Sequence, residues 1–515
     1  MSSAWSHGYF TDLNYTYGYY PDLSPVRLRL ACRASGLDVA LPDPCTYLEL
    51  GFGQGYALNI HAASNAGSFW GADLNPSHVV HARDLASGTD ADLTLLDDAF
   101  TDLARRTDLP GFDVIALHGV WSWISDESRA AILDLIRRRL KPGGIVYMSY
   151  NCLPGWAVDG PTRHLMMLSE RFSDRREGPA GRIRNAGEMV KAVVDAEGAY
   201  YALNRPARDH ALSLTGKDGR YLAHEYLNAD WHLPYFSEVE AAMREAKMTW
   251  VGPARHLDRI DDINLSPRSA ALLDGMGDPV LRESLRDYLV NQRFRCDLFV
   301  KGGHRLTLEA QRDALESQPF ALLKPPAEVD LKVRGARGEA DLPEDIYRPV
   351  LEALASDDYR PKSIAELRTH PALASQPQQQ VAGAVIICLG VNAITPVVTP
   401  SKSIIARCAA FNRHQTLNMP SAPELGFLAS PVTGGGVPVP RPVQLILLEP
   451  DVLKRPARQL AETVWARYLR TNERIFRDGQ RIDDPKESLD ALERHAATLL
   501  ERTAPVYRAL GLLPG

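Results

Sequence analysis

The chain has few cysteines and no long apolar run. Its six cysteines form no CxxC pair and no zinc-finger spacing, so we expect no metal site and a reducing, cytoplasmic location. No stretch of about 18 apolar residues occurs, so no membrane-spanning helix is expected. The N-terminus lacks the basic start and apolar core of a signal peptide, which also favours the cytoplasm.

The chain also lacks an excess of positive charge. It has 58 Lys and Arg residues against 64 Asp and Glu residues, for a formal net charge of -6. Nucleic-acid-binding proteins are more often basic or carry a basic stripe, so we expect no nucleic-acid partner. The 515 residues are 45% hydrophobic and 24% charged, which is typical of a globular protein with roughly two to four domains.

Three glycines stand between a predicted strand and a predicted helix. Residues 45–50 are typical of a short strand, and Gly51, Gly53 and Gly55 follow it at alternating positions. A helix is predicted from Tyr56, so the glycines lead to a helix N-terminus, where backbone N–H groups can cradle a nucleotide. The dinucleotide fingerprint GxGxxG would need glycine at position 56, so a dinucleotide site is not favoured.

The pattern ExGxGxG, which begins at Glu49, resembles motif I of class I S-adenosylmethionine (SAM)-dependent methyltransferases. Asp73 ends the next predicted strand, where an ionised carboxylate suits hydrogen bonds from two ribose hydroxyls. Asp98 follows the third predicted strand and resembles the motif III acid that accepts from the adenine amino group, with Ala99 and Phe100 against the ring. The alternative for Asp98 is a helix N-cap.

Strands and helices alternate over the first third of the chain, which predicts a parallel, doubly wound sheet with ligands at the carboxyl ends of its strands. Two later segments are expected to be the sixth strand and the antiparallel seventh strand. The expected fold is therefore α/β, a class I methyltransferase with a Rossmann-like seven-stranded sheet, helical insertions and a separate mixed or helical C-terminal domain. The predicted strands are 45–50, 68–73, 92–96, 112–118, 145–150, 248–252 and 294–302.

The methyl acceptor should lie beyond the fourth and fifth strands, close to the sulfonium. The segments that follow these strands supply His118, Trp121, Tyr150 and Asn151 as candidate catalytic residues. Aromatic faces suit a sulfonium or ammonium cation, and His118 or Tyr150 could accept a proton. A packing role is the alternative for each of these residues.

An aromatic segment precedes the predicted fold and is too aromatic for plain disorder. We expect residues 1–40 to cap the cofactor site through Tyr9 and Tyr15, the alternative being a surface arm. The predicted cofactor contacts are Tyr9, Tyr15, Glu49, Gly51, Phe52, Gly53, Gly55, Asp73, Leu74, Asp98, Ala99, Phe100, His118 and Gly119.

The segments YLELGFGQG, HGVWSWIS, LKPGGIVYMSYNCLPGW, YLAHEYLN and NQRFRCDLFVKG occur in this order. Together they resemble bacterial class I methyltransferases with a methyltransferase regulatory domain, a group that includes the rickettsial-type protein lysine methyltransferases that modify outer-membrane proteins. The resemblance covers about residues 5–303. Trp121 departs from it, since the family more often has tyrosine there, and Phe52 stands where cysteine would be expected.

This resemblance implies a SAM domain with inserted segments and a C-terminal domain that helps to hold a protein acceptor. We expect the SAM domain to be residues 41–303, with insertions at about 155–235 and 256–292. A linker at 304–329 and a winged-helix-like or mixed helical domain at 330–515 would follow.

Three functions stay open on the sequence. The first is methylation of protein lysine, which the large accessory regions favour. The second is O- or N-methylation of a small molecule or surface glycan, and the third is SAM-dependent regulation without turnover. The product of the first two would be S-adenosylhomocysteine. Candidate substrate contacts in one insertion, with packing as the alternative, are His224, Glu225, Tyr226 and Trp231.

Overall fold

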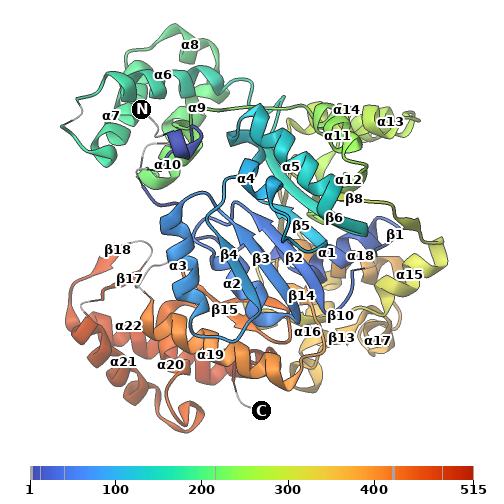
Figure 1. Ribbon diagram of the computed structural model, residues 1–515. Helices are drawn as coiled ribbons and strands as arrows, with labels where there is room; N and C mark the ends of the chain where they lie inside the picture. Colours follow the sequence, from blue (N-terminus) through green and yellow to red (C-terminus); the bar gives the residue numbers. More distant parts are fainter. Residues whose placement is uncertain are drawn as a thin grey trace.

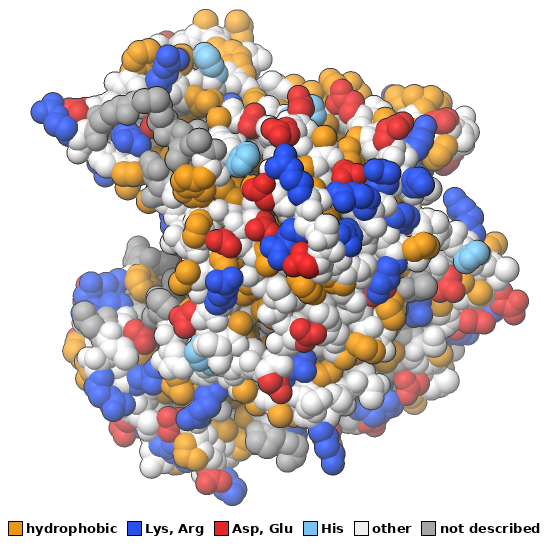
Figure 2. All heavy atoms as spheres, in the orientation of Figure 1, with side chains coloured by type: hydrophobic (Ala, Val, Ile, Leu, Met, Phe, Trp, Pro, Cys, Tyr) orange, Lys and Arg blue, Asp and Glu red, His pale blue; other side chains and the backbone are white. Residues whose placement is uncertain are grey.

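The protein is described by a computed structural model in which a central sheet is covered by helices on both faces (Figure 1). A lobe of helices stands at the top of the view and the C-terminal region closes the molecule below. Basic and acidic side chains are mixed over the face shown in Figure 2. The described residues are 4–11, 13–39, 41–174, 176–214, 216–419, 424–471, 473–477 and 480–513.

The central sheet has seven strands in the order β4-β3-β2-β5-β6-β8-β7. Strands β2 to β6 run parallel, and β8 is antiparallel to both of its neighbours. This confirms the predicted class I methyltransferase sheet with its antiparallel seventh strand. The strands are β2 (Cys45–Leu50), β3 (Gly67–Ala72), β4 (Leu93–Leu96), β5 (Phe112–Leu117), β6 (Leu140–Asn151), β7 (Thr249–Pro253) and β8 (Phe294–Val300).

Both faces of the sheet are covered, which is why its central strands are apolar along their length. All six residues of β5 are buried. One face packs against α4, α5 and α11, and the other packs against α1, α2 and α3. These helices are α1 (Pro25–Ala34), α2 (Tyr56–Ser64), α3 (Pro76–Ala86), α4 (Phe100–Arg105), α5 (Asp126–Arg139) and α11 (Phe236–Glu245).

Strand β6 begins earlier than the sequence pattern predicted. Helix α5 ends at Arg139, and β6 already starts at Leu140, so that β6 includes the Lys-Pro-Gly-Gly stretch of residues 141–144. The reason is that this stretch pairs with the end of β8: Gly143 donates to the carbonyl of Lys301, and Lys301 donates to the carbonyl of Gly144. A register shift between β5 and β6 accommodates the extra residues.

The first insertion forms a helical lobe with a hydrophobic core of its own, which includes Met166, Ile183, Val190 and Tyr226. The motif YLAHEYLN, residues 221–228, lies mostly in the last helix of this lobe. The lobe contains α6 (Gly160–Phe172), α7 (Pro179–Asp195), α8 (Ala199–Leu203), α9 (Arg205–Ser213) and α10 (Gly219–Tyr226). The second insertion contains α12 (Asp261–Asn264), α13 (Pro267–Asp274) and α14 (Pro279–Val290).

The C-terminal region is mixed, with a three-stranded sheet in the order β13-β10-β14 and several two-stranded hairpins. Strand β10 falls inside the expected linker and pairs with the rest of this region. Its helices and strands are α15 (Leu308–Glu316), β10 (Pro319–Leu322), β11 (Lys332–Gly335), β12 (Gly338–Asp341), α16 (Glu344–Tyr359), β13 (Lys362–Ser363), α17 (Ile364–Thr369), α18 (Gln378–Gly390), β14 (Ile394–Pro396), α19 (Lys402–Asn418), β15 (Phe427–Ser430), β16 (Gly435–Pro438), α20 (Arg441–Leu447), α21 (Ala457–Thr471), β17 (Ile475–Arg477), β18 (Gln480–Ile482), α22 (Pro485–Thr498) and α23 (Ala504–Ala509).

The hairpin β15–β16 of the C-terminal region docks directly on the methyltransferase domain. The hydroxyl of Tyr56, in the first turn of α2, donates to the carbonyl of Phe427 at 2.7 Å and accepts from its N–H at 2.9 Å. The hydroxyl of Tyr19 accepts from the N–H of Gly436 at 2.6 Å. The two regions are therefore joined by hydrogen bonds between tyrosine hydroxyls and the hairpin backbone, and they are not independent units.

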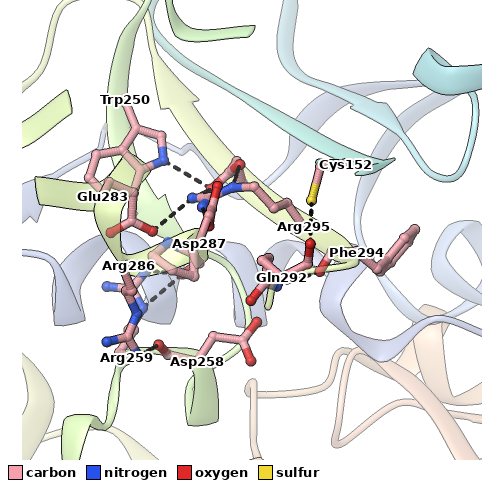
Figure 3. Close-up of polar contacts among 12 residues, drawn as sticks. Cys152, Trp250, Asp258, Arg259, Glu283, Arg286, Asp287, Gln292, Phe294 and Arg295 are labelled. Atoms are coloured by element: carbon pink, nitrogen blue, oxygen red, sulfur yellow. Dashed lines mark hydrogen bonds and ion pairs between the residues drawn. The ribbon is translucent and has the colours of Figure 1, made fainter. Parts of the chain in front are cut away.

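A buried arginine joins the second insertion to the sheet (Figure 3). Arg295 on β8 donates to Glu283 at 2.8 Å and to Asp297 at 2.7 Å, and it also pairs with Asp287. All four side chains are less than 10% exposed. Trp250 also donates to Asp297, at 3.0 Å.

Replacing Arg295 by methionine should destabilise the protein by about 3–5 kcal/mol, because three buried carboxylates lose their shared cation. Calorimetric melting of the full chain would measure the loss. The matched control is Arg105→Ala, whose side chain is 74% exposed in a surface ion pair and should change melting little. Equal melting of both variants would contradict a structural role for the cluster.

None of the helices in the described part of the chain combines the length and apolarity needed to cross a bilayer.

Candidate functional site

A cavity opens at the carboxyl ends of β2, β3 and β5, beside the point where the strand order reverses. The N-terminal segment and helix α10 complete its wall. Most of the predicted cofactor contacts line it. The predicted residues that line the cavity are Tyr9, Tyr15, Glu49, Gly51, Phe52, Gly53, Asp73, Leu74, Phe100, His118 and Gly119.

The glycine loop needs its glycines for two reasons. Gly51, Gly53 and Gly55 all have positive φ, at 69°, 57° and 72°, which side chains disfavour. A Cβ on Gly51 would also lie 2.5 Å from Val120. On Gly55, which does not line the cavity, it would lie 2.4 Å from Ala82, so that glycine serves the packing of α2 on α3.

The carboxylate of Asp73 is held by three donors. One oxygen accepts from the N–H of Gly53 at 2.8 Å. The other accepts from the N–H of Asn75 at 3.0 Å and lies 3.1 Å from Nδ1 of His78. The orientation of Asp73 toward the cavity is therefore fixed by the backbone of the glycine loop and of the β3–α3 turn.

Glu49 is buried at the end of β2, and its Oε2 atom has no hydrogen-bond partner within the described structure. Burial, and to a lesser degree the nearby Asp73, raise the pKa of Glu49 to about 8. An unsatisfied acid facing a cavity suits a ligand that carries hydrogen-bond donors. SAM carries ribose hydroxyls and an ammonium group, so Glu49 and Asp73 both fit it.

His118 is a neutral ring wedged between aromatic neighbours. Its Nδ1 atom lies 3.0 Å from the hydroxyl of Tyr147 and 3.1 Å from that of Ser149. Its ring lies 3.8 Å from the ring of Tyr20, centroid to centroid. Burial, together with the charge of Arg255, lowers the pKa of His118 to about 3, so the ring cannot take up a proton at neutral pH.

Asp98 and Ala99 do not line the cavity, although the sequence pattern pointed to them. The Asp98 carboxylate instead forms an ion pair with Arg106 at 3.0 Å. Neither does its side chain cap helix α4: Ala99 is the N-cap residue, without a side-chain hydrogen bond. Phe100, which stands next to them in the chain, and Leu74, which comes after β3, do line the cavity.

Three of the four candidate catalytic residues also lie outside the cavity lining, and only His118 lies in it. Trp121 and Tyr150 are buried in the hydrophobic core on one face of the sheet. Side chains alternate along a strand, so Tyr147 faces His118 while Tyr150 points away and donates to Asp297 at 2.7 Å. Asn151 does not line the cavity but contacts a residue that does, because its Nδ2 atom lies 3.5 Å from Glu225.

The N-terminal segment closes the cavity from the side opposite the sheet. It is held by the helical lobe, since Phe10 donates from its N–H to Asn228 at 2.9 Å, and Nε2 of His224 lies 3.0 Å from the carbonyl of Leu13. It is held by the glycine loop as well, since Gln54 donates to the carbonyl of Tyr15 at 2.9 Å.

Several residues line the cavity although no motif in the sequence points to them. Tyr20 and Phe294 come from segments far apart in the chain, and Trp123 comes from the short helical turn after β5. His224 and Glu225 had been named only as substrate contacts. The lining residues outside the predicted cofactor set are Thr16, Gly18, Tyr20, Gln54, Tyr56, Ala57, Val120, Trp123, Ile124, His224, Glu225 and Phe294. In the described ranges no group of three or more acidic, His or Cys side chains is arranged to hold a metal ion.

Comparison with known proteins agrees with this geometry. Residues 48–144 match a family model described as a methyltransferase domain, and residues 218–301 match one described as a predicted methyltransferase regulatory domain. The uncharacterized protein sll1526 of Synechocystis sp. is 35% identical over 514 residues, which is 99% of each chain. The uncharacterized protein RP789 of Rickettsia prowazekii is 26% identical over 341 residues, 63% of this chain and 59% of its own.

Among solved structures, PKMT2 from Rickettsia typhi in complex with AdoHcy superposes with a TM-score of 0.70 and 21% identity, covering 97% of this chain and 100% of that one. The sheet, the glycine loop and these matches define a class I SAM-dependent methyltransferase with SAM as its cofactor. The chain belongs to the family that combines this methyltransferase domain with the regulatory domain, and the Synechocystis protein is another member.

Replacing Asp73 by alanine should weaken SAM binding at least about tenfold, because hydrogen bonds to a charged group contribute about 1.5–3 kcal/mol each. Calorimetric titration with SAM measures the change. The matched control is Asp97→Ala, an exposed acid at the end of β4 outside the cavity lining. Equal affinity of the Asp73 variant and the wild type would remove Asp73 from the ribose site.

Proposed function

We propose that the protein methylates lysine amines of a protein substrate. The observation that carries this proposal is the concentration of aromatic rings on the cavity wall, which suits a lysine ammonium group and its methylated products. The rings are those of Tyr9, Tyr15, Tyr20, Trp123 and Phe294. Support also comes from the resemblance to rickettsial-type protein lysine methyltransferases and from the fold shared with PKMT2 over nearly the whole chain.

In this proposal the cofactor is held at the carboxyl ends of β2 and β3. Glu49 and Asp73 accept hydrogen bonds from its donor groups, the glycine loop provides room for close approach, and Phe100 packs against the adenine. When bound, SAM supplies a methyl group on a positively charged sulfur. The predicted cap, residues 1–40, of which the structure describes 4–11 and 13–39, covers the site and excludes water through Tyr9 and Tyr15.

The four candidate catalytic residues take different roles here. His118, in the cavity wall, positions the acceptor side through its contact with Tyr20. Asn151 acts through Glu225, and Trp121 and Tyr150 support the packing behind the wall. We assign residues 41–303 to the SAM domain and residues 330–515 to holding the protein acceptor. The six cysteines are unpaired and buried, which supports a cytoplasmic location.

Incubation with methyl-labelled SAM and fractionated bacterial lysate should place label on protein. The reason is that a lysine side chain is long enough to extend from the surface of a substrate protein into the cavity. The label should be sensitive to protease and should yield methyl-lysine on hydrolysis. Label in small molecules or glycan would contradict the lysine proposal and favour the alternative acceptor. Binding of SAM without any transfer would favour a regulatory protein without turnover.

Replacing His118 by alanine should slow methyl transfer while leaving SAM affinity nearly unchanged. The factor should be the same from about pH 6 to about pH 9, because the ring is already neutral throughout that range. Single-turnover rates at several pH values would test this, with the exposed His164→Ala as the control. An unchanged rate would remove His118 from the site, and a pH-dependent factor would show that the ring titrates.

A further inference from the structure

Glu225 is a carboxyl group that faces the cofactor cavity without a cation. It lies near the end of α10, inside the segment matched by the regulatory-domain model. Its one hydrogen bond is accepted from Asn151 at 3.5 Å, and no lysine, arginine or histidine among the described residues forms an ion pair with it. By contrast, the three buried acids beside Arg295, on the other face of the sheet, share its guanidinium.

The groups that face Glu225 are neutral at physiological pH. Phenols come from the N-terminal segment and from α10 itself, and burial raises the pKa of each. The adjacent His224 is neutral as well, because burial lowers its pKa to about 4. The phenols are those of Tyr9, Tyr15, Tyr20, Tyr221 and Tyr226.

Ionisation of Glu225 among neutral groups is unfavourable in free energy, and a bound cation would stabilise the carboxylate. Burial raises the pKa of Glu225 to about 7, and the hydrogen bond from Asn151 opposes that rise. An acid that is partly buried, faces a cavity and has no ionic partner among the described residues points to a positively charged ligand. Aromatic rings on the same wall favour the same kind of ligand.

The position of Glu225 indicates that the positively charged ligand is the methyl acceptor rather than the cofactor. Asp73 and Phe100 mark the adenosine side, at the ends of β3 and β4. Glu225 is tied instead to Asn151, at the end of β6, across the cavity from those strands. The remaining cavity acid, Glu49, ends β2 next to Asp73 and belongs to the cofactor side.

We propose that Glu225 binds the ammonium group of the acceptor and removes its proton. This inference rests on the proposed amine methylation. The ammonium transfers one proton to the Glu225 carboxylate, and the nitrogen lone pair then forms the new N–C bond. The C–S bonding pair stays on sulfur, and the proton on Glu225 passes to water after the product leaves. His118 is a much weaker base, because burial lowers the pKa of its ring to about 3.

A binding test needs no knowledge of the acceptor. Sinefungin is a SAM analogue that carries an amine on carbon in place of the methylsulfonium group, and it puts a cation where the reaction occurs. Calorimetry would compare sinefungin with S-adenosylhomocysteine for the wild type, Glu225→Gln, Glu225→Asp and the exposed control Glu188→Gln.

The glutamine variant should lose about tenfold or more of the preference for sinefungin over S-adenosylhomocysteine, because a charge-assisted hydrogen bond is lost. The aspartate and Glu188 variants should keep most of it. In the wild type the preference should shrink from about pH 8 to about pH 6, as Glu225 takes up a proton. S-adenosylhomocysteine affinity checks that each variant is folded.

Turnover supplies the second arm, with labelled SAM and the lysate protein fraction. Glu225→Gln should transfer methyl about 100-fold more slowly near neutral pH, and the deficit should shrink at higher pH as water deprotonates lysine unaided. An unchanged sinefungin preference in Glu225→Gln would overturn the inference. Absence of methyl-lysine with wild-type enzyme would instead overturn the proposed function, so the two failures are distinguishable.

Discussion

The Asp73 carboxylate is the interaction on which the cofactor site depends. It accepts from the backbone of the glycine loop and of the β3–α3 turn, and it lies against His78. His78 in turn accepts from the N–H of Tyr15 at 3.2 Å. One side chain thus joins the loop under the cofactor, the helix beside it and the segment above it. The same two oxygens that would receive ribose also organise the walls around them.

The residues of β6 have different roles on the two faces of the sheet. On one face β6 presents Tyr147 and Ser149, which hold His118 at the cavity. On the other face the alternating residue Tyr150 reaches Asp297 and the buried guanidinium of Arg295. The insertion that carries the partners of Arg295 is thereby fixed to the same strand that ends at Asn151. Strand β6 therefore connects the cavity wall at His118 with the second insertion.

Much of this arrangement could be predicted, because parallel strands and their glycine turns leave local patterns. The positions of the strands along the chain, the glycine loop, and the placement of Asp73, Tyr9 and Tyr15 at the cavity were all predicted from local patterns. Asp98 could not be resolved, because Arg106 competes for its carboxylate. The direction of Tyr150 depends on strand parity after a register shift, which no pattern reports. The approach of Glu225 to Asn151 is a tertiary contact between segments with no shared periodicity.

The hairpin β15–β16 gives the C-terminal region a direct hold on helix α2, through the hydroxyl of Tyr56. That tyrosine occupies the position at which a dinucleotide site would carry its third glycine. It is one of the residues that line the cavity, and its hydroxyl reaches the hairpin. A shortened chain without the hairpin would leave this hydroxyl without either of its backbone partners. A change at the distant end of the protein can therefore reach the first turn of α2 without altering a residue of the glycine loop.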